Sequence, residues 1–291
     1  TQPAIARATA ASLLAPDISV PAVERALTHA TNDQSALLRT ISVQALNGSD
    51  NKVLPLLERL NDPVRAVRIA AAEGLVDVPG NLIPAALTKA FSQANQEYQS
   101  SLKINADFPS GRMRMAMDQH RRGNLERAAE EYLAVLKIDN GYNRARMNLA
   151  QLYYSQGKLS ATENLYRTVT EKEPEASEAH YSLGLLMAEQ GDYEQAARSL
   201  EAAATSGNNP RAWYNLAVLH QQSGKSLEAE KAYLAALQLT PNNSEFINGL
   251  VSLYGQQQRW YKAMQLIDRA LISDPTNPSL QQLKRAITQR L

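Results

Sequence analysis

The stretch 177–210 contains two successive runs of apolar residues at helical spacing, separated by a polar turn around Gly191. In the first run Leu183 and Met187 share a face with the small residue Gly184. The apolar face of the second run is formed by Tyr193, Ala196, Leu200 and Ala203. Apolar residues three or four positions apart lie on one face of a helix. The pattern therefore predicts a helical hairpin.

The same two-helix pattern recurs along the chain at a nearly constant period. The turn glycines are Gly123, Gly157, Gly191 and Gly224, and Gln258 replaces them in a fifth copy, which gives spacings of 34, 34, 33 and 34 residues. An alanine recurs in the second helix as Ala128, Ala196, Ala229 and Ala263, with Thr162 in the remaining copy. A single hairpin cannot bury its apolar face alone, so each neighbour must supply half of a shared core. The sequence therefore predicts an all-α solenoid.

This period, with its recurring glycine and alanine, resembles the tetratricopeptide repeat over residues 109–277. The resemblance implies a right-handed α-solenoid of about five hairpins in this array. We expect them to begin near Pro109, Asn143, Ser177, Pro210 and Ser244. The segment 278–291 carries Leu280, Leu283, Ile287 and Leu291 on one helical face and polar residues on the other, which predicts a C-terminal capping helix.

Residues 1–80 carry a different repeat, in which residues 61–75 align with residues 32–46 at an offset of 29. An Asp-Pro turn before a helix of small residues resembles the turn of HEAT repeats. Aspartate caps such a helix, and proline fits its first turn. An arginine recurs at one place in each copy, and we expect it to bridge to the turn of the neighbouring hairpin. These arginines are Arg7, Arg39 and Arg68. The earliest copy lacks its preceding helix, so we expect further repeats upstream in a longer parent protein.

The segment 81–108 is predicted to connect the two kinds of repeat. A Val-Asp-Val-Pro-Gly break at 76–80 ends the first kind, and residues 82–104 then read as one long helix. Ala94 and Tyr98 lie 34 residues before Ala128 and Tyr132, so the second half of this helix imitates the second helix of a tetratricopeptide repeat. We expect the join to be rigid.

Composition narrows the function classes. The chain has 30 Lys and Arg against 29 Asp and Glu, a net charge of +1 that gives no electrostatic case for binding nucleic acid. It has no cysteine, which excludes disulfides, thiolate metal sites and CxxCH haem attachment in these residues. Its four histidines fall in different repeats, and no phosphate loop or nucleophile motif occurs. We expect no cofactor, metal, membrane span or catalysis in this part of the protein.

The tetratricopeptide resemblance implies that residues two, five, six, nine and twelve of each repeat point into a concave groove. The candidate partner-binding residues are Met113, Arg114, Met117, Met147, Asn148, Gln151, Tyr181, Leu185, Tyr214, Asn215 and Val218. Most of them form an apolar stripe of methionine, tyrosine, leucine and valine, side chains that suit an irregular protein partner. We expect a protein or peptide segment to bind there. The alternative is that neighbouring helices fill the groove and the stripe is core.

Asn148 and Asn215 match the asparagine with which family members hold the backbone of a ligand. Its amide offers a donor and an acceptor, so it can pair with a peptide unit of any sequence. The alternative is that each asparagine bonds within its own solenoid. The subclass that clamps a chaperone's terminal carboxylate matches poorly, because Glu178 and Ser182 stand where the clamp has lysine or arginine.

Residues 60–72, Glu97-Tyr98 and Asn105-Ala106-Asp107 together resemble the C-terminal region of bacterial multihaem c-type cytochromes. The resemblance implies a haem-bearing CxxCH region upstream of Thr1, export to the periplasm, and a non-catalytic docking module here. The alternatives are a generic cytoplasmic or periplasmic scaffold for complex assembly and the regulatory arm of a larger enzyme such as a glycosyltransferase. The identity of the partner and the oligomeric state stay open.

Overall fold

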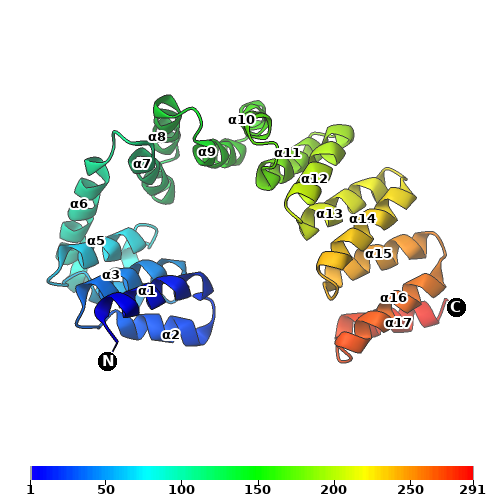
Figure 1. Ribbon diagram of the computed structural model, residues 1–291, viewed down its shortest axis with the longest axis horizontal. Helices are drawn as coiled ribbons and strands as arrows, with labels where there is room; N and C mark the ends of the chain where they lie inside the picture. Colours follow the sequence, from blue (N-terminus) through cyan, green and yellow to red (C-terminus); the bar gives the residue numbers. More distant parts are fainter. Residues whose placement is uncertain (1, 291) are drawn as a thin grey trace. The chain divides into compact units, whose positions relative to one another are not determined.

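The structure, a computed structural model, describes residues 2–290 of the chain. Over these residues the regular secondary structure is helical and contains no strand, which confirms the predicted all-α class (Figure 1). The chain forms two compact units, Thr1–Ala145 and Arg146–Leu291, each with its own hydrophobic core. The predicted change of repeat type near residue 80 falls inside the first unit and stays a prediction.

The first unit begins with a stack of short helices. They are α1 (Ala4–Leu14), α2 (Pro21–Ala30), α3 (Ala36–Ala45), α4 (Val53–Glu58) and α5 (Arg65–Gly74). Helix α3 contacts both α1 and α5, and its Val43 is fully buried together with Leu27 and Leu56 from its neighbours. The small side chains of α5 allow this close approach, because Ala70, Ala71 and Ala72 are all buried.

The three recurrent arginines form a ladder along this stack. Arg7 donates to Asp33 at 2.7 Å, and Arg39 donates two hydrogen bonds to the carboxylate of Asp62 at 2.7 and 2.9 Å. Both acceptors lie in the turn of the next hairpin, which confirms the predicted bridge. Arg68 differs, because its partner Glu97, at 2.6 and 3.0 Å, lies within a helix. A bidentate arginine–carboxylate pair fixes geometry as well as adding energy, so the ladder sets the spacing of these helices.

The connecting helix α6 (Thr88–Ile104) is shorter than the predicted 82–104. Residues 80–87 instead form two 3₁₀ turns, Gly80–Leu82 and Ala85–Leu87. Pro84 explains the correction, because a proline disfavours the helical conformation of the residue before it, and Ile83 has φ −87° and ψ 113°. The first unit then closes with a hairpin of α7 (Pro109–Arg121) and α8 (Leu125–Ile138).

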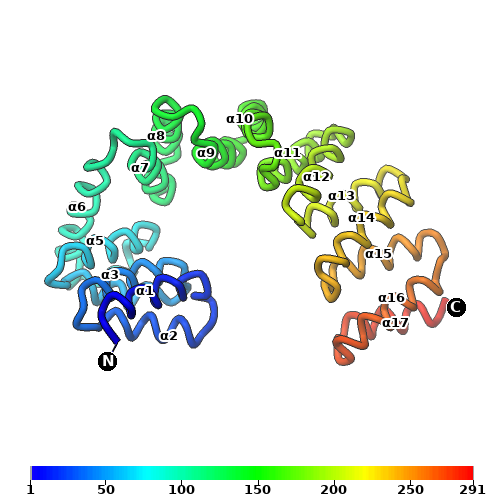
Figure 2. Tube along the Cα trace, in the orientation of Figure 1, coloured from blue at the N-terminus to red at the C-terminus, as the bar shows by residue number. Residues whose placement is uncertain are grey.

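The second unit continues the hairpin pattern, and Figure 2 shows the short turns between its successive helices. Its helices are α9 (Asn143–Ser155), which begins just before the unit boundary, α10 (Leu159–Lys172), α11 (Ser177–Glu189), α12 (Tyr193–Ser206), α13 (Pro210–Gln222), α14 (Ser226–Leu239), α15 (Ser244–Gln256), α16 (Trp260–Ser273) and α17 (Pro278–Thr288). The first helix of every predicted repeat begins at the expected residue. The predicted capping helix is α17, with Leu280 and Ile287 buried, whereas Leu291 lies outside the described residues.

Local chemistry explains where these helices begin and how closely they pack. Asn209 and Asn243 cap α13 and α15, since their side-chain oxygens accept backbone N–H groups of the first turn. Gly191 adopts a φ of +80°, which only glycine reaches without strain, and so reverses the chain between α11 and α12. Gly184 lies against Leu200, where an added Cβ would be 2.8 Å from Leu200 Cγ. The repeat register predicted from the sequence is therefore correct.

Candidate functional site

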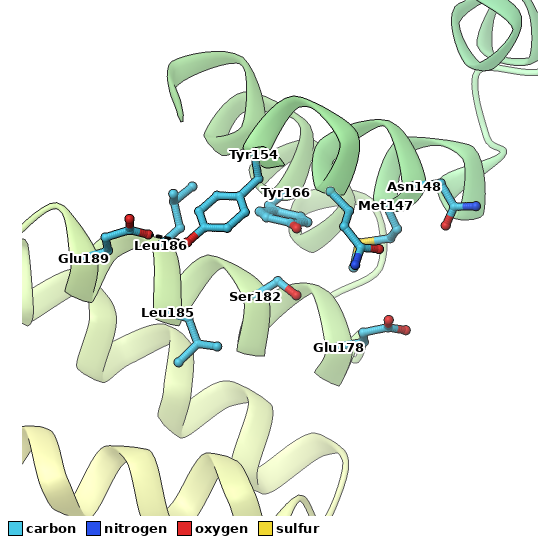
Figure 3. Close-up of a pocket in the computed structure, with 10 residues that line it drawn as sticks. Met147, Asn148, Tyr154, Tyr166, Glu178, Ser182, Leu185, Leu186 and Glu189 are labelled. Carbon is cyan, nitrogen blue, oxygen red and sulfur yellow. Dashed lines mark hydrogen bonds between the residues drawn. The ribbon is translucent and has the colours of Figure 1, made fainter. Parts of the chain in front are cut away.

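A pocket of about 310 Å³ lies within the second unit, between α9, α10 and α11 (Figure 3). Its lining residues are Met147, Asn148, Gln151, Tyr154, Tyr166, Glu178, Ser182, Leu185, Leu186 and Glu189. Helix α9 supplies the first four, α10 supplies Tyr166, and α11 supplies the rest. The pocket is therefore formed by the first helices of two consecutive repeats over the second helix of the earlier one.

The deep part of the pocket is apolar and aromatic. Tyr166 is only 7% exposed, and Leu186 is buried beside it. Burial raises the pKa of Tyr166, and a hydrogen bond with Ser182 opposes that shift. The phenol is therefore neutral near pH 7 and presents a hydroxyl at the base of the pocket. Met147 is half-buried and Leu185 is exposed, so both offer apolar surface to a ligand.

The polar groups are distributed along the pocket instead of converging on one point. Figure 3 shows Tyr154 and Glu189 at one end and Asn148 and Glu178 at the other. The Tyr154 hydroxyl donates to Glu189 Oε2 at 2.7 Å, and this bond raises the pKa of Tyr154. Glu178 and Glu189 are the charged residues of the lining, and both are acidic. The pocket thus carries negative charge at its two ends.

The predicted groove residues separate into groups. Four of them, Met147, Asn148, Gln151 and Leu185, line the pocket. The prediction missed Tyr154, Tyr166, Glu178, Ser182, Leu186 and Glu189. Positions two, six and twelve of the repeats already pointed to Glu178, Ser182 and Tyr154, so those three could have been found from the register. Tyr166 lies on the second helix of its repeat, and Leu186 and Glu189 lie outside the five groove positions, so the register points to none of the three.

Three other predicted residues belong to a packed interface further along the unit. Asn215 Nδ2 donates to the Tyr181 hydroxyl at 3.0 Å, so this asparagine bonds within its own solenoid, as the alternative interpretation held. The ring of Tyr214 stacks on Phe246 with centroids 4.8 Å apart and meets the edge of Tyr233 at 5.7 Å. These side chains therefore make their contacts within the chain. Val218, a fourth predicted residue, packs half-buried against the core.

The remaining predicted residues lie on α7 in the first unit and do not line the pocket. Met113 is 3% exposed, so it is core and not groove surface. Arg114 is within 3.6 Å of Glu73, and Met117 is half-buried. Position five of this repeat is therefore interior, a difference that the shared repeat register could not reveal.

Two sequence models described as tetratricopeptide repeat match the chain. One matches residues 113–161, 147–211 and 188–244, and the other matches residues 222–287, so together they span more than half of the chain. The chain belongs to the tetratricopeptide repeat family. These matches begin at residue 113, and the likeness of residues 1–80 to HEAT repeats stays a prediction.

Two solved structures share the fold over part of this chain. The crystal structure of MamA protein gives a TM-score of 0.52 at 18% identity and covers 59% of this chain and 94% of its own. YrrB, titled a TPR protein with an unusual peptide-binding site, gives 0.50 at 17% identity and covers 64% of this chain and 97% of its own. At these identities the likeness shows the fold alone. No curated protein matches the chain.

Two further properties concern residues 2–290. No group of three or more histidine, aspartate or glutamate side chains in this range is placed to hold a metal ion. No helix in the same range is both long and apolar enough to cross a membrane.

Proposed function

We propose that this chain is a protein-interaction module that binds a segment of a partner protein in the pocket between α9 and α11. Tetratricopeptide repeat proteins generally mediate protein–protein interaction or assembly. The observation that carries the proposal is the pocket itself, seven of whose ten lining residues hold repeat positions that the family resemblance assigns to the ligand-binding face. We assign it no catalytic step.

The lining suits a peptide segment. Asn148 and Gln151 each carry an amide with a donor and an acceptor, which can pair with the backbone of an extended chain. Met147 and Leu185 provide apolar surface for side chains of that segment. A pocket of about 310 Å³ accommodates one or two side chains of a ligand, with the rest of the segment passing over the rim.

A pocket-filling substitution tests this proposal. Peptides selected from a random phage-displayed library on the wild-type protein should lose about tenfold or more in affinity for Ser182→Trp, because the indole occupies the pocket. Ser160→Trp on the exposed start of α10 is the matched control, since Ser160 does not line the pocket. Equal affinities of every selected peptide for wild type and Ser182→Trp would contradict the proposal.

A narrower proposal concerns the parent protein: a docking or assembly module of a periplasmic, haem-carrying electron-transfer protein. It is supported by the resemblance of residues 60–72, Glu97-Tyr98 and Asn105-Ala106-Asp107 to the C-terminal region of multihaem c-type cytochromes. CxxCH motifs upstream of Thr1 in the parent reading frame would support it. A catalytic domain in that upstream region would instead favour the regulatory arm of an enzyme. If the upstream region has neither CxxCH motifs nor a catalytic domain, a general assembly scaffold is favoured.

A further inference from the structure

We propose that the segment bound in this pocket carries a lysine or arginine side chain whose cation lies against Tyr154 and Glu189. This inference rests on the proposed function and names the chemistry of the partner. The occupant is a basic segment of another protein, with apolar residues beside its cation.

The charges of the lining support this choice. Glu178 and Glu189 both line the pocket, and no lysine or arginine does. Neither glutamate forms an ion pair with any lysine or arginine among residues 2–290. Elsewhere in the same unit Glu163, Glu194 and Glu245 each pair with an arginine. The pocket thus offers carboxylates that the chain leaves without a cation.

The chain itself shows how a tyrosine–glutamate pair holds a cation. The Tyr254 hydroxyl donates to Glu230 Oε1 at 2.9 Å, the same bond that joins Tyr154 to Glu189. Arg259 binds that glutamate at 2.5 and 3.0 Å, and its guanidinium carbon lies 4.8 Å from the centre of the Tyr254 ring. Lys262 reaches the same carboxylate at 3.3 Å. The pair therefore combines an ion pair with a cation–π contact.

Among residues 2–290 no lysine or arginine forms an ion pair with Glu189. Lys158 is the repeat counterpart of Arg259, since each caps the next helix and follows a tyrosine by five residues. Lys158 lies over the ring of Tyr153, 4.9 Å from its centre, as Arg259 lies over Tyr254. Tyr154, the residue after Tyr153, is 44% exposed, so its ring face is accessible. A cation from a partner can therefore make at Tyr154 and Glu189 the two kinds of contact that Arg259 makes at Tyr254.

The second carboxylate sets a spacing for the ligand. Glu178 and Glu189 are eleven residues apart on α11, which corresponds to about 16 Å at a rise of about 1.5 Å per residue. In an extended segment side chains four positions apart lie on the same face, about 13 Å apart, and the long side chains of lysine or arginine span the rest of that distance. A segment with two basic residues four positions apart and an apolar residue midway between them would place one cation near each glutamate and its apolar side chain near Leu185.

Defined peptides test the inference by isothermal titration calorimetry. The probes are nine-residue peptides with neutral termini, leucine at the centre, alanine and serine elsewhere, and lysine, norleucine or glutamate at both positions three and seven. We expect the lysine probe to bind about tenfold tighter than the norleucine probe and the glutamate probe to bind weakest. Glu189→Gln, which keeps an acceptor for Tyr154, should lower the affinity for the lysine probe about fivefold.

Controls separate this inference from the proposed function. Glu201→Gln removes one exposed negative charge on α12, outside the pocket, and should leave the lysine probe unaffected. Glu189→Lys should reduce binding of the lysine probe and increase binding of the glutamate probe. If the three probes bound with equal affinity and Ser182→Trp abolished their binding, the preference for a basic segment would be wrong. The proposal that the pocket binds a peptide would still be supported. Absence of binding by every probe would contradict the inference, and phage-selected peptides sensitive to Ser182→Trp would still support the proposed function.

Discussion

Two interfaces of the second unit use the same repeat positions and differ in what fills them. Between α9 and α11, Met147 at position five faces a pocket whose far wall includes Ser182 at position six. Between α13 and α15, Tyr214 at position five lies against Gly249 at position six, whose added Cβ would be 3.1 Å from Tyr214 Cε2. The helix register is shared, so the two interfaces differ in the side chains that these positions carry.

The packed interface also satisfies its own charges. Arg211 lies over the rings of Tyr214 and Phe246 and pairs with Glu245 at 2.7 Å. At the pocket, Glu178 and Glu189 have no such cation among the described residues. One interface is thus complete within the chain, and the other has an acidic rim that a partner can neutralise. The proposed binding site thus lies where position five is Met147, and the packed interface where position five is Tyr214 stacked on Phe246.

Substitution at position six should show the largest contrast in stability. Gly249→Val should lower the free energy of unfolding by about 3 kcal/mol, because its Cβ would lie 2.6 Å from Tyr233 Cε1 in a packed core. Ser182→Thr at the matching position keeps the hydroxyl that bonds Tyr166, adds a methyl group beside the pocket and should cost less than about 1 kcal/mol. Urea unfolding of both variants measures the contrast. Equal losses would mean that the two interfaces are packed alike.

The acidic groups provide the next contrast. Glu230 is held by Arg259, which lowers its pKa to about 2, with Tyr254 and Lys262 adding to the shift. Its stabilisation is therefore full above the ordinary glutamate pKa of 4.5 and is lost as the pH falls toward 2. Glu230→Gln should cost about 2 kcal/mol at pH 7, and the difference from wild type should shrink below pH 4.5.

Glu189→Gln is the matched comparison, since Glu189 also accepts a tyrosine hydroxyl but has no cation. Its stability should follow that of wild type from pH 7 to pH 3 within about 0.5 kcal/mol. Thermal unfolding across this pH range gives both curves. If Glu189→Gln lowered the stability as much as Glu230→Gln, Glu189 would stabilise the fold as strongly as Glu230 does.

The two asparagines differ in their place relative to the pocket, since only Asn148 lines it. Asn148→Ala should weaken a pocket peptide severalfold, because Asn148 lines the pocket. Asn215→Ala removes the bond to Tyr181 and should cost about 1 kcal/mol of stability with no change in peptide affinity. Calorimetry and thermal unfolding of the two single variants measure this. Equal effects of both on peptide affinity would restore Asn215 as a binding residue.

The sequence predicted the fold well because its strongest signals act locally. The turn glycines, the small residues at helix contacts and the first residue of each hairpin all depend on neighbours within one repeat or the next. The start of the connecting helix was predicted too early, because Pro84 disfavours the helical conformation of the residue before it. The candidate site was predicted only in part, because the family positions indicate which residues face the groove but not whether other side chains fill it. Whether Met113 or Tyr214 is exposed depends on side-chain volumes contributed by other helices.

The turns provide the smallest expected contrast. Gly157 and Gly191, which flank α10 and α11 near the pocket, have φ values of +71° and +80°, whereas Gln258 holds the same turn before α16 at +56°. A residue with a side chain costs about 1–2 kcal/mol of folding free energy in this left-handed region. Glycine avoids that strain, but its more flexible unfolded chain offsets part of the benefit.

Gln258→Gly should therefore raise the free energy of unfolding by about 0.5 kcal/mol. Gly191→Ala should lower it by about 1 kcal/mol, because the same strain is introduced where glycine had avoided it. Urea unfolding of the two variants measures how much the backbone strain at Gln258 lowers the free energy of unfolding. A decrease for Gln258→Gly would mean that the glutamine side chain makes stabilising contacts that exceed its backbone strain.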